Sequence, residues 1–308
     1  MNTLLVLLPD FAVIALGAFL SARVGEEGWR RIDWLSYHVL YPALLFRAAA
    51  SRPIEPGALL LVGTLACAVV TLGFVLSLAV TRRAPVDRLE RAGAVQNGWR
   101  FNTALGFVAI AALPDGASAV LAIVVGTGIP LANLYAVTLL SRAREAGSSR
   151  RDRLLAALRE IALNPFLLAS LAGVAIGLGG IALPAVPAAF VARLADAALP
   201  IVLLSLGAAL RGTPAWPPAP FALALHAIRL LILPAVVWIA ATLSGASGLL
   251  PATLLVFAAL PTATAAHVLA ARYGADRRRV ALLVMQSSLL GLVTLPLWTA
   301  LAARLSGG

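Results

Sequence analysis

Long apolar runs alternate along the chain with short polar segments. Most runs have about the 20 residues that an α-helix needs to cross a bilayer, and they end at charged residues or at Gly/Pro clusters. The pattern predicts ten membrane-spanning helices. The predicted spans are 3–22, 34–50, 57–81, 93–113, 117–141, 161–180, 196–211, 219–243, 249–272 and 279–303.

The composition agrees with an all-α integral membrane protein. Hydrophobic residues make up 61% of the chain and charged residues 12%, against roughly 45–50% and about 25% in soluble domains. No polar stretch is long enough to predict a separate soluble domain. Cys67 is the single cysteine, so we expect no disulfide within the chain.

The positive charge is concentrated on one predicted side of the membrane. The net charge is +11, and all 24 basic residues are arginines, a usage typical of GC-rich bacterial genomes. Most of these arginines follow predicted spans 1, 3, 5, 7 and 9. The positive-inside rule then predicts a bacterial inner-membrane protein with both termini in the periplasm. The same distribution favours contact with the lipid bilayer and gives no case for nucleic acid.

The chain divides into two halves with five predicted spans each. A basic cytoplasmic linker, 142–159, separates residues 1–141 from residues 160–308. An odd number of spans in each half inserts the second half with the opposite orientation. The sequence therefore predicts two inverted five-helix repeats within one membrane domain.

Corresponding spans of the two halves, 93–113 and 249–272, are both interrupted by residues that weaken a helix. Arg100, Asn102 and Thr103 stand in the first, and Pro261 removes a backbone donor from the second. A simple proline kink is the alternative interpretation of the second. Paired interruptions favour two broken helices that cross near the middle of the membrane, which is typical of transporter binding sites.

Such interruptions can bind an anion without a large number of charged side chains. Helix N-termini present free N–H groups and a positive dipole end. Arg100 can add a forked cation, although it can instead form a structural pair inside the protein. His267 can contact a substrate or carry a proton, or simply bond between helices. The candidate substrate-binding residues are Arg100, Asn102, Thr103, Pro261, Thr262, Thr264 and His267.

Other polar residues in the spans are assigned structural roles. Tyr41 is expected to pack, and Gln96, Asn97, Gln286 and Ser287 are expected to join helices. Asp196, at the start of span 196–211, is remote from both interruptions, which disfavours cation exchange. No metal-ligand cluster, P-loop or Ser/His/Asp arrangement occurs, so we expect no metal, no cofactor and no enzymatic activity.

Four segments resemble bacterial members of the auxin efflux carrier family, close to its malonate-transporter-like branch. They are 164–212, 259–298, RFNT at 100–103 and YPALLF at 41–46. The resemblance covers essentially the whole chain.

The resemblance implies a scaffold of helices 1, 2, 6 and 7 and a mobile transport domain of helices 3–5 and 8–10. It also implies organic anions as substrates. Asn102 matches the motif asparagine of helix 4, and Pro261 matches the crossover proline of helix 9. Many members have a proline where this chain has Ala109, which puts the break of helix 4 in question.

The expected function is secondary active transport of a small organic anion, a mono- or dicarboxylate, by an elevator-type alternating-access mechanism. Coupling to H⁺ or Na⁺ and a homodimer are both compatible with the sequence. Two other classes stay open, namely an ion-coupled carrier of a neutral or cationic solute and a membrane-embedded enzyme or sensor.

Overall fold

The protein is built from helices alone over the residues that the structure describes. The computed structural model covers residues 3–50, 56–82, 86–144, 155, 159, 162–211 and 219–307, and these contain no strand. Five helical stretches are long and apolar enough to cross a membrane, and two shorter apolar helices accompany them. The five are Leu60–Thr81, Ala117–Arg144, Ala185–Leu210, Pro220–Ser244 and Arg277–Ser306. The chain is therefore a multi-pass, all-α membrane protein.

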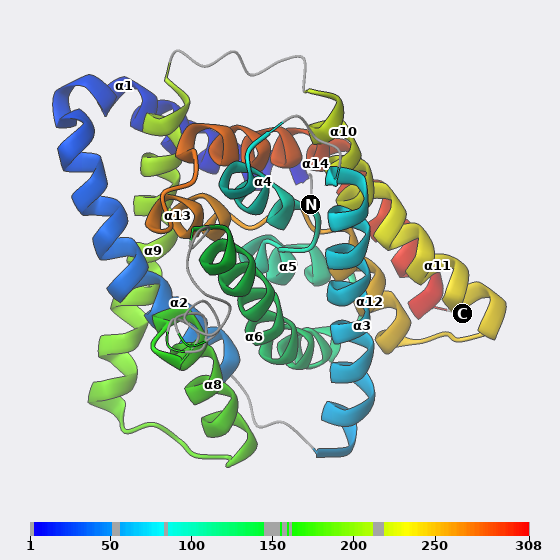
Figure 1. Cartoon of the computed structure of the whole chain (residues 1–308). Coiled ribbons are helices and arrows are strands. Elements are labelled where there is room, and N and C mark those ends of the chain that lie inside the picture. Colours follow the sequence, from blue (N-terminus) through cyan, green and yellow to red (C-terminus); the bar gives the residue numbers. More distant parts are fainter. Residues whose placement is uncertain are drawn as a thin grey trace.

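Four helices pack together on one side of the molecule, and we call them the four-helix bundle (Figure 1). They are α1 (Thr3–Leu35), α2 (Tyr41–Ala50), α8 (Pro165–Leu178) and α9 (Ala185–Leu210). Helix α1 packs along α9, and α2 packs against both α8 and α9. Gly25, with φ of 72°, turns the chain within α1. A π-helical turn at Ser36–Leu40 then leads into α2.

The other helices form a second unit, the crossover bundle (Figure 1). Helix α3 packs against α6, and α12 contacts α6, α11 and α14. Its members are α3 (Pro56–Thr81), α4 (Arg88–Val95), α5 (Thr103–Ala109), α6 (Ala117–Arg144), α10 (Pro220–Ala227), α11 (Leu233–Ser244), α12 (Leu249–Ala259), α13 (Ala265–Arg272) and α14 (Arg277–Ser306).

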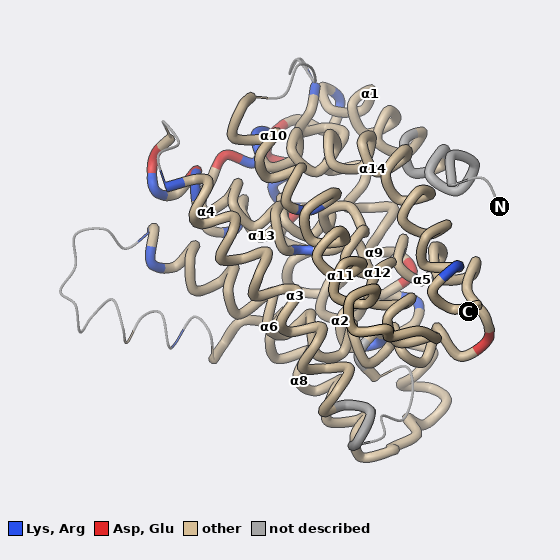
Figure 2. Tube along the Cα trace, turned by 90° about the vertical axis from the view of Figure 1, so that its right-hand side faces the viewer, with Lys and Arg blue, Asp and Glu red and all other residues tan. Residues whose placement is uncertain are grey.

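Charged residues gather mainly at one end of the molecule, around α4 and α13 (Figure 2). Arg277 forms an ion pair with Asp33 at 3.1 Å, and Arg279 pairs with Glu90. These contacts bring the segments after predicted spans 1, 3 and 9 to the same end, as the distribution of arginines predicts. Most of the predicted linker 142–159, namely residues 145–154 and 156–158, lies outside the described residues.

The predicted start of one span was wrong. We predicted a helix over 196–211, whereas α9 begins at Ala185, so Asp196 lies inside the helix and not at its start. Pro184 and Pro187 stand where the helix begins, and proline is tolerated in a first helical turn. The charges of Arg193 and Asp196 made the first part of α9 resemble a loop.

Candidate functional site

The first interruption separates α4 from α5. A 3₁₀ turn at Gln96–Gly98 ends α4, and Trp99 leaves the helical conformation with φ of −128°. Asn102 restarts the helix as the N-cap of α5, because its Oδ1 accepts a hydrogen bond from the Leu105 N–H at 3.2 Å. The break predicted in span 93–113 is therefore present. Ala109 lies in the last turn of α5, beyond the break.

The second interruption separates α12 from α13. Helix α12 ends at Ala259, Leu260 has an extended conformation with ψ of 138°, and α13 starts at Ala265. The ring of Pro261 packs on Gly291 of α14, where any side chain would overlap it. The Thr262 N–H donates to Ser287 Oγ at 3.0 Å. The proline thus marks a complete break and not a simple kink.

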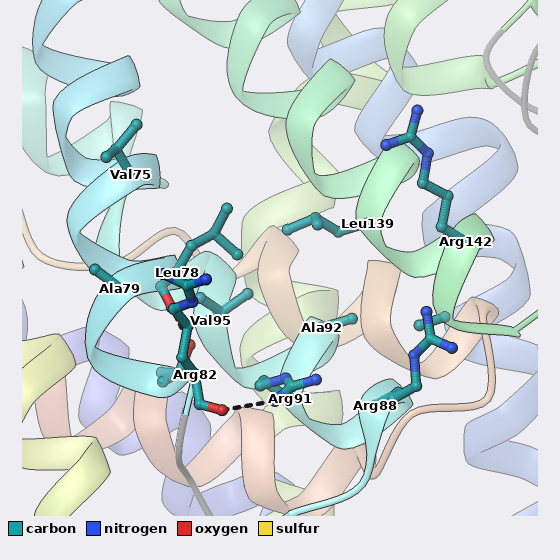
Figure 3. A pocket seen from close by; sticks show the side chains of 12 residues that line it. Val75, Leu78, Ala79, Arg82, Arg88, Arg91, Ala92, Val95, Leu139 and Arg142 are labelled. Carbon is teal, nitrogen blue, oxygen red and sulfur yellow. Dashed lines mark hydrogen bonds between the residues drawn. The ribbon is translucent and has the colours of Figure 1, made fainter.

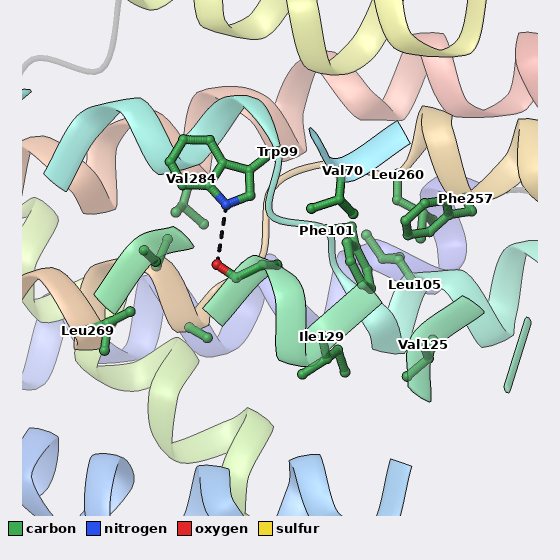
Figure 4. Close-up of a cluster of buried hydrophobic side chains, with 14 of the residues drawn as sticks. Val70, Trp99, Phe101, Leu105, Val125, Ile129, Phe257, Leu260, Leu269 and Val284 are labelled. Atoms are coloured by element: carbon green, nitrogen blue, oxygen red, sulfur yellow. Dashed lines mark hydrogen bonds between the residues drawn. The ribbon is translucent and has the colours of Figure 1, made fainter. Parts of the chain in front are cut away.

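The two interruptions are bonded to each other. The Asn102 N–H donates to the carbonyl of Pro261 at 2.9 Å, and the Thr262 hydroxyl donates to the carbonyl of Asn97 at 2.8 Å. Phe101 packs edge-on against Phe257 with ring centroids 4.5 Å apart, in a buried apolar cluster (Figure 4). Two segments from different halves of the chain therefore form one packed, hydrogen-bonded crossover.

Arg229 stabilises the C-terminal end of α12. This fully buried residue lies in a π-helical turn between α10 and α11. Its Nε donates to the carbonyl of Leu260 at 2.6 Å, and its Nη2 donates to that of Phe257 at 2.8 Å. The last carbonyls of a helix lack partners within the helix, and a cation there interacts favourably with the helix dipole. We therefore assign Arg229 a structural role.

A cavity of about 670 Å³ lies between the two bundles, next to both interruptions. Helices α2 and α9 line it from the four-helix bundle. Helix α6 and residues beside the two interruptions line it from the crossover bundle. Its polar and charged lining residues are Tyr41, Arg47, Arg100, Asn102, Thr103, Ser118, Asn133, Asp196 and Thr264.

Arg100 is the cationic group of this cavity that lacks a bonding partner. The residue is 4% exposed, and its Nε and Nη1 atoms bond to no group in the described part of the chain. Asn133 is also buried, and its Nδ2 donor is also unsatisfied among the described residues. Unsatisfied buried donors are costly, so these two side chains favour a ligand that accepts hydrogen bonds.

The remaining charges of the cavity neutralise each other. Arg47 of α2 donates to Asp196 of α9 at 2.7 Å and to the carbonyl of Ala192 at 3.2 Å. Tyr41 and Thr264 join the two bundles through a hydroxyl–hydroxyl hydrogen bond of 2.8 Å. The formal charge that the lining presents to a ligand is therefore the positive charge of Arg100.

The structure divides the seven candidate residues into two groups. Arg100, Asn102, Thr103 and Thr264 line the cavity. Pro261, Thr262 and His267 do not appear in its lining and are buried behind it. His267 Nδ1 is 2.7 Å from the carbonyl of Thr264, so its ring bonds to the start of its own helix.

The sequence interpretation missed several lining residues, namely Tyr41, Arg47, Asn133 and Asp196. Tyr41 was expected only to pack, whereas it lines the cavity. The clue for Arg47 and Asp196 was a pair of opposite charges inside apolar helices of both halves.

Of the four residues that were predicted to join helices, two do so through their side chains and two do not. Ser287 and Gln286 join helices as expected, through Thr262 and His226. Gln96 Nε2 and Asn97 Nδ2 instead bond to carbonyls of their own helix, three residues earlier.

Comparison with known proteins identifies the class of this molecule. Residues 136–299 match the family model described as "Membrane transport protein". The chain therefore belongs to this family, the auxin efflux carrier family that its motifs resemble, and it is a membrane transporter and not an enzyme.

A relative from Rhizobium meliloti (strain 1021) is similar over almost the whole chain. It is 28% identical over 301 residues, which cover 93% of this chain and 92% of the relative. That protein is named "Putative malonate transporter".

Proposed function

We propose that this chain is a secondary active transporter of a small organic anion, a mono- or dicarboxylate. The observation that carries the proposal is Arg100, a buried guanidinium that lines the cavity and lacks bonding partners in the described structure. A carboxylate would satisfy its free N–H groups with charge-assisted hydrogen bonds. The relative named for malonate, a dicarboxylate, agrees with this substrate class.

The lining favours an anion over a neutral or cationic solute. Among the described lining residues the one carboxylate, Asp196, is already bonded to Arg47, so these residues offer no free acid to a cation. Asn133 and Arg100 contribute free donors. Helices α5 and α13 both begin at the cavity, where their positive dipole ends add to the potential. The volume of about 670 Å³ also lies within the usual range for small-molecule sites.

We further propose an elevator-type movement in which the crossover bundle slides against the four-helix bundle. The cavity lies between the two bundles, and the bonded interruptions would carry the binding groups as one unit. A second hollow of about 640 Å³ separates α1 from α13 at the charged end and includes Asp33 and Arg277. The cavity beside the interruptions and this second hollow both lie on the interface between the two bundles. In an elevator movement they would open to opposite sides of the membrane.

The packing of helices supports two inverted repeats, 1–141 and 160–308. Predicted helices 1 and 6 would correspond to each other, and so would 2 and 7. The observed contacts of α1 with α9 and of α2 with α8 are related by that symmetry. With the arginine-rich end in the cytoplasm, the proposed location is a bacterial inner membrane with both termini in the periplasm.

Thermal unfolding of the purified protein should detect the substrate class. We expect one or more small carboxylates to stabilise the protein, by about 2.7 kcal/mol at 100 times the dissociation constant. Amines, neutral amino acids and inorganic salts serve as the comparison panel. Stabilisation by amines or neutral solutes alone would contradict the anion proposal and favour a carrier of a neutral or cationic solute.

Cross-linking should test the elevator movement separately. Asp33 and Arg277 pair across the interface between the bundles, so cysteines at both positions, joined by a short bismaleimide in a Cys67→Ser background, should stop uptake. Glu90 and Arg279 pair within the crossover bundle and provide the matched control, whose cross-link should leave most uptake intact. Undiminished uptake after complete Asp33–Arg277 cross-linking would rule out sliding at this interface.

A further inference from the structure

A third hollow lies at the charged end of the crossover bundle, and its lining shares no residue with the cavity beside the two interruptions. It has a volume of about 680 Å³ and is lined by residues at the end of α3, in α4 and at the end of α6. Four arginines line it, namely Arg82, Arg88, Arg91 and Arg142. Figure 3 shows their guanidinium groups around an apolar floor that includes Leu78, Val95 and Leu139.

The four arginines are not neutralised by carboxylates within the part of the chain that the structure describes. Arg91 Nη1 donates to the carbonyl of Arg82 at 3.2 Å, which holds two of the four together. The nearby acids of α4 are occupied elsewhere. Asp87 accepts from the first N–H groups of α4, and Glu90 pairs with Arg279.

The apolar floor distinguishes this site from an ordinary cluster of surface arginines. Leu78, Val95 and Leu139 come from three different helices, and they meet directly beside the charged groups. Arginines suit a phosphate, because the guanidinium fork matches its oxygens. A ligand that fills the whole hollow therefore needs an anionic head joined to apolar chains.

We propose that this hollow binds an anionic phospholipid, with its phosphate among the four arginines and acyl chains along the apolar floor. Basic pockets between membrane helices on the cytoplasmic side are suited to such head groups. The bound lipid contacts α3, α4 and α6 and so holds three helices of the crossover bundle together. This inference does not depend on the transported substrate.

Lipid titration of the full chain in detergent tests the site, with thermal unfolding and native mass spectrometry as readouts. Phosphatidylglycerol should stabilise the protein and remain bound, whereas phosphatidylethanolamine and sodium phosphate at equal concentration should do neither. The triple variant Arg82→Gln/Arg88→Gln/Arg142→Gln should bind phosphatidylglycerol about 100-fold more weakly, since each arginine near an anionic head group contributes about a fivefold increase in affinity.

The matched control removes three exposed arginines that do not line the hollow, with the variant Arg31→Gln/Arg144→Gln/Arg278→Gln. It should retain the affinity of the unmodified protein. If the triple variant does not fold, the single variants Arg88→Gln and Arg142→Gln should each show about a fivefold loss. Equal losses in the control, or equal stabilisation by sodium phosphate or phosphatidylethanolamine, would overturn the proposal.

Discussion

Replacing Arg100 with methionine should abolish carboxylate transport and, at the same time, stabilise the empty protein. The guanidinium is buried and lacks partners among the described residues, and such unsatisfied groups cost about 1–3 kcal/mol each. Methionine is also unbranched and apolar, so it removes this cost with little change of shape. The substrate should lose charge-assisted hydrogen bonds of about 1.5–3 kcal/mol each, which predicts binding at least about 100-fold weaker.

Uptake into proteoliposomes and thermal unfolding with and without a carboxylate measure both effects. Arg304→Met provides the control, because Arg304 is exposed in the last turn of α14 and does not line the cavity. A variant of Arg100 that is less stable when empty, yet still stabilised by carboxylates, would show that the residue has a structural role instead.

Two substitutions of Asn102 should separate its role as a helix cap from its proposed role in substrate binding. Asn102→Ala should abolish transport and lower the stability by about 0.5–2 kcal/mol, because α5 loses its cap. Asn102→Asp should also abolish transport, since a carboxylate beside Arg100 repels an anion and competes for the guanidinium. It should retain the stability of α5, because aspartate caps a helix as well as asparagine does.

Asn164 supplies the matched control for capping. It caps α8 through hydrogen bonds of 2.9 Å and 3.3 Å from the N–H groups of Phe166 and Leu167, and it does not line the cavity. Asn164→Ala should lower stability by at least as much as Asn102→Ala, because it also removes the hydrogen bond from Asn164 Nδ2 to the Tyr37 hydroxyl, while each folded molecule continues to transport. Normal uptake by folded Asn102→Asp would exclude the Asn102 side chain from the binding site.

The sequence was sufficient to predict the interrupted helices because their signals are local. Pro261 cannot donate a backbone hydrogen bond, and Asn102 is a strong N-cap, so each marks a helix boundary by its own chemistry. The absence of proline at Ala109 did not matter, because the helix breaks before Asn102 and not after it.

The cavity could be predicted only in part, because most of it depends on contacts between distant segments. Tyr41 meets Thr264, and Arg47 meets Asp196, across more than a hundred residues of sequence. Hydropathy does not reveal such pairs. The direction of a side chain just after a break was equally unpredictable, which is why Thr264 lines the cavity whereas Thr262 and His267 are buried behind it.

The unpaired charge of Arg100 has an electrical consequence for the proposed transport cycle. Arg100 belongs to the crossover bundle, so movement of that bundle through the membrane field would carry a positive charge with it. A full crossing at 100 mV changes the free energy by about 2.3 kcal/mol per charge. Arg229 is a second buried cation of the same bundle, so a bound monocarboxylate would lower the moving charge by one, and voltage would act more strongly on the empty protein than on the loaded one. A dicarboxylate would cancel the charges of both buried arginines, and voltage would then act on the return of the empty protein alone.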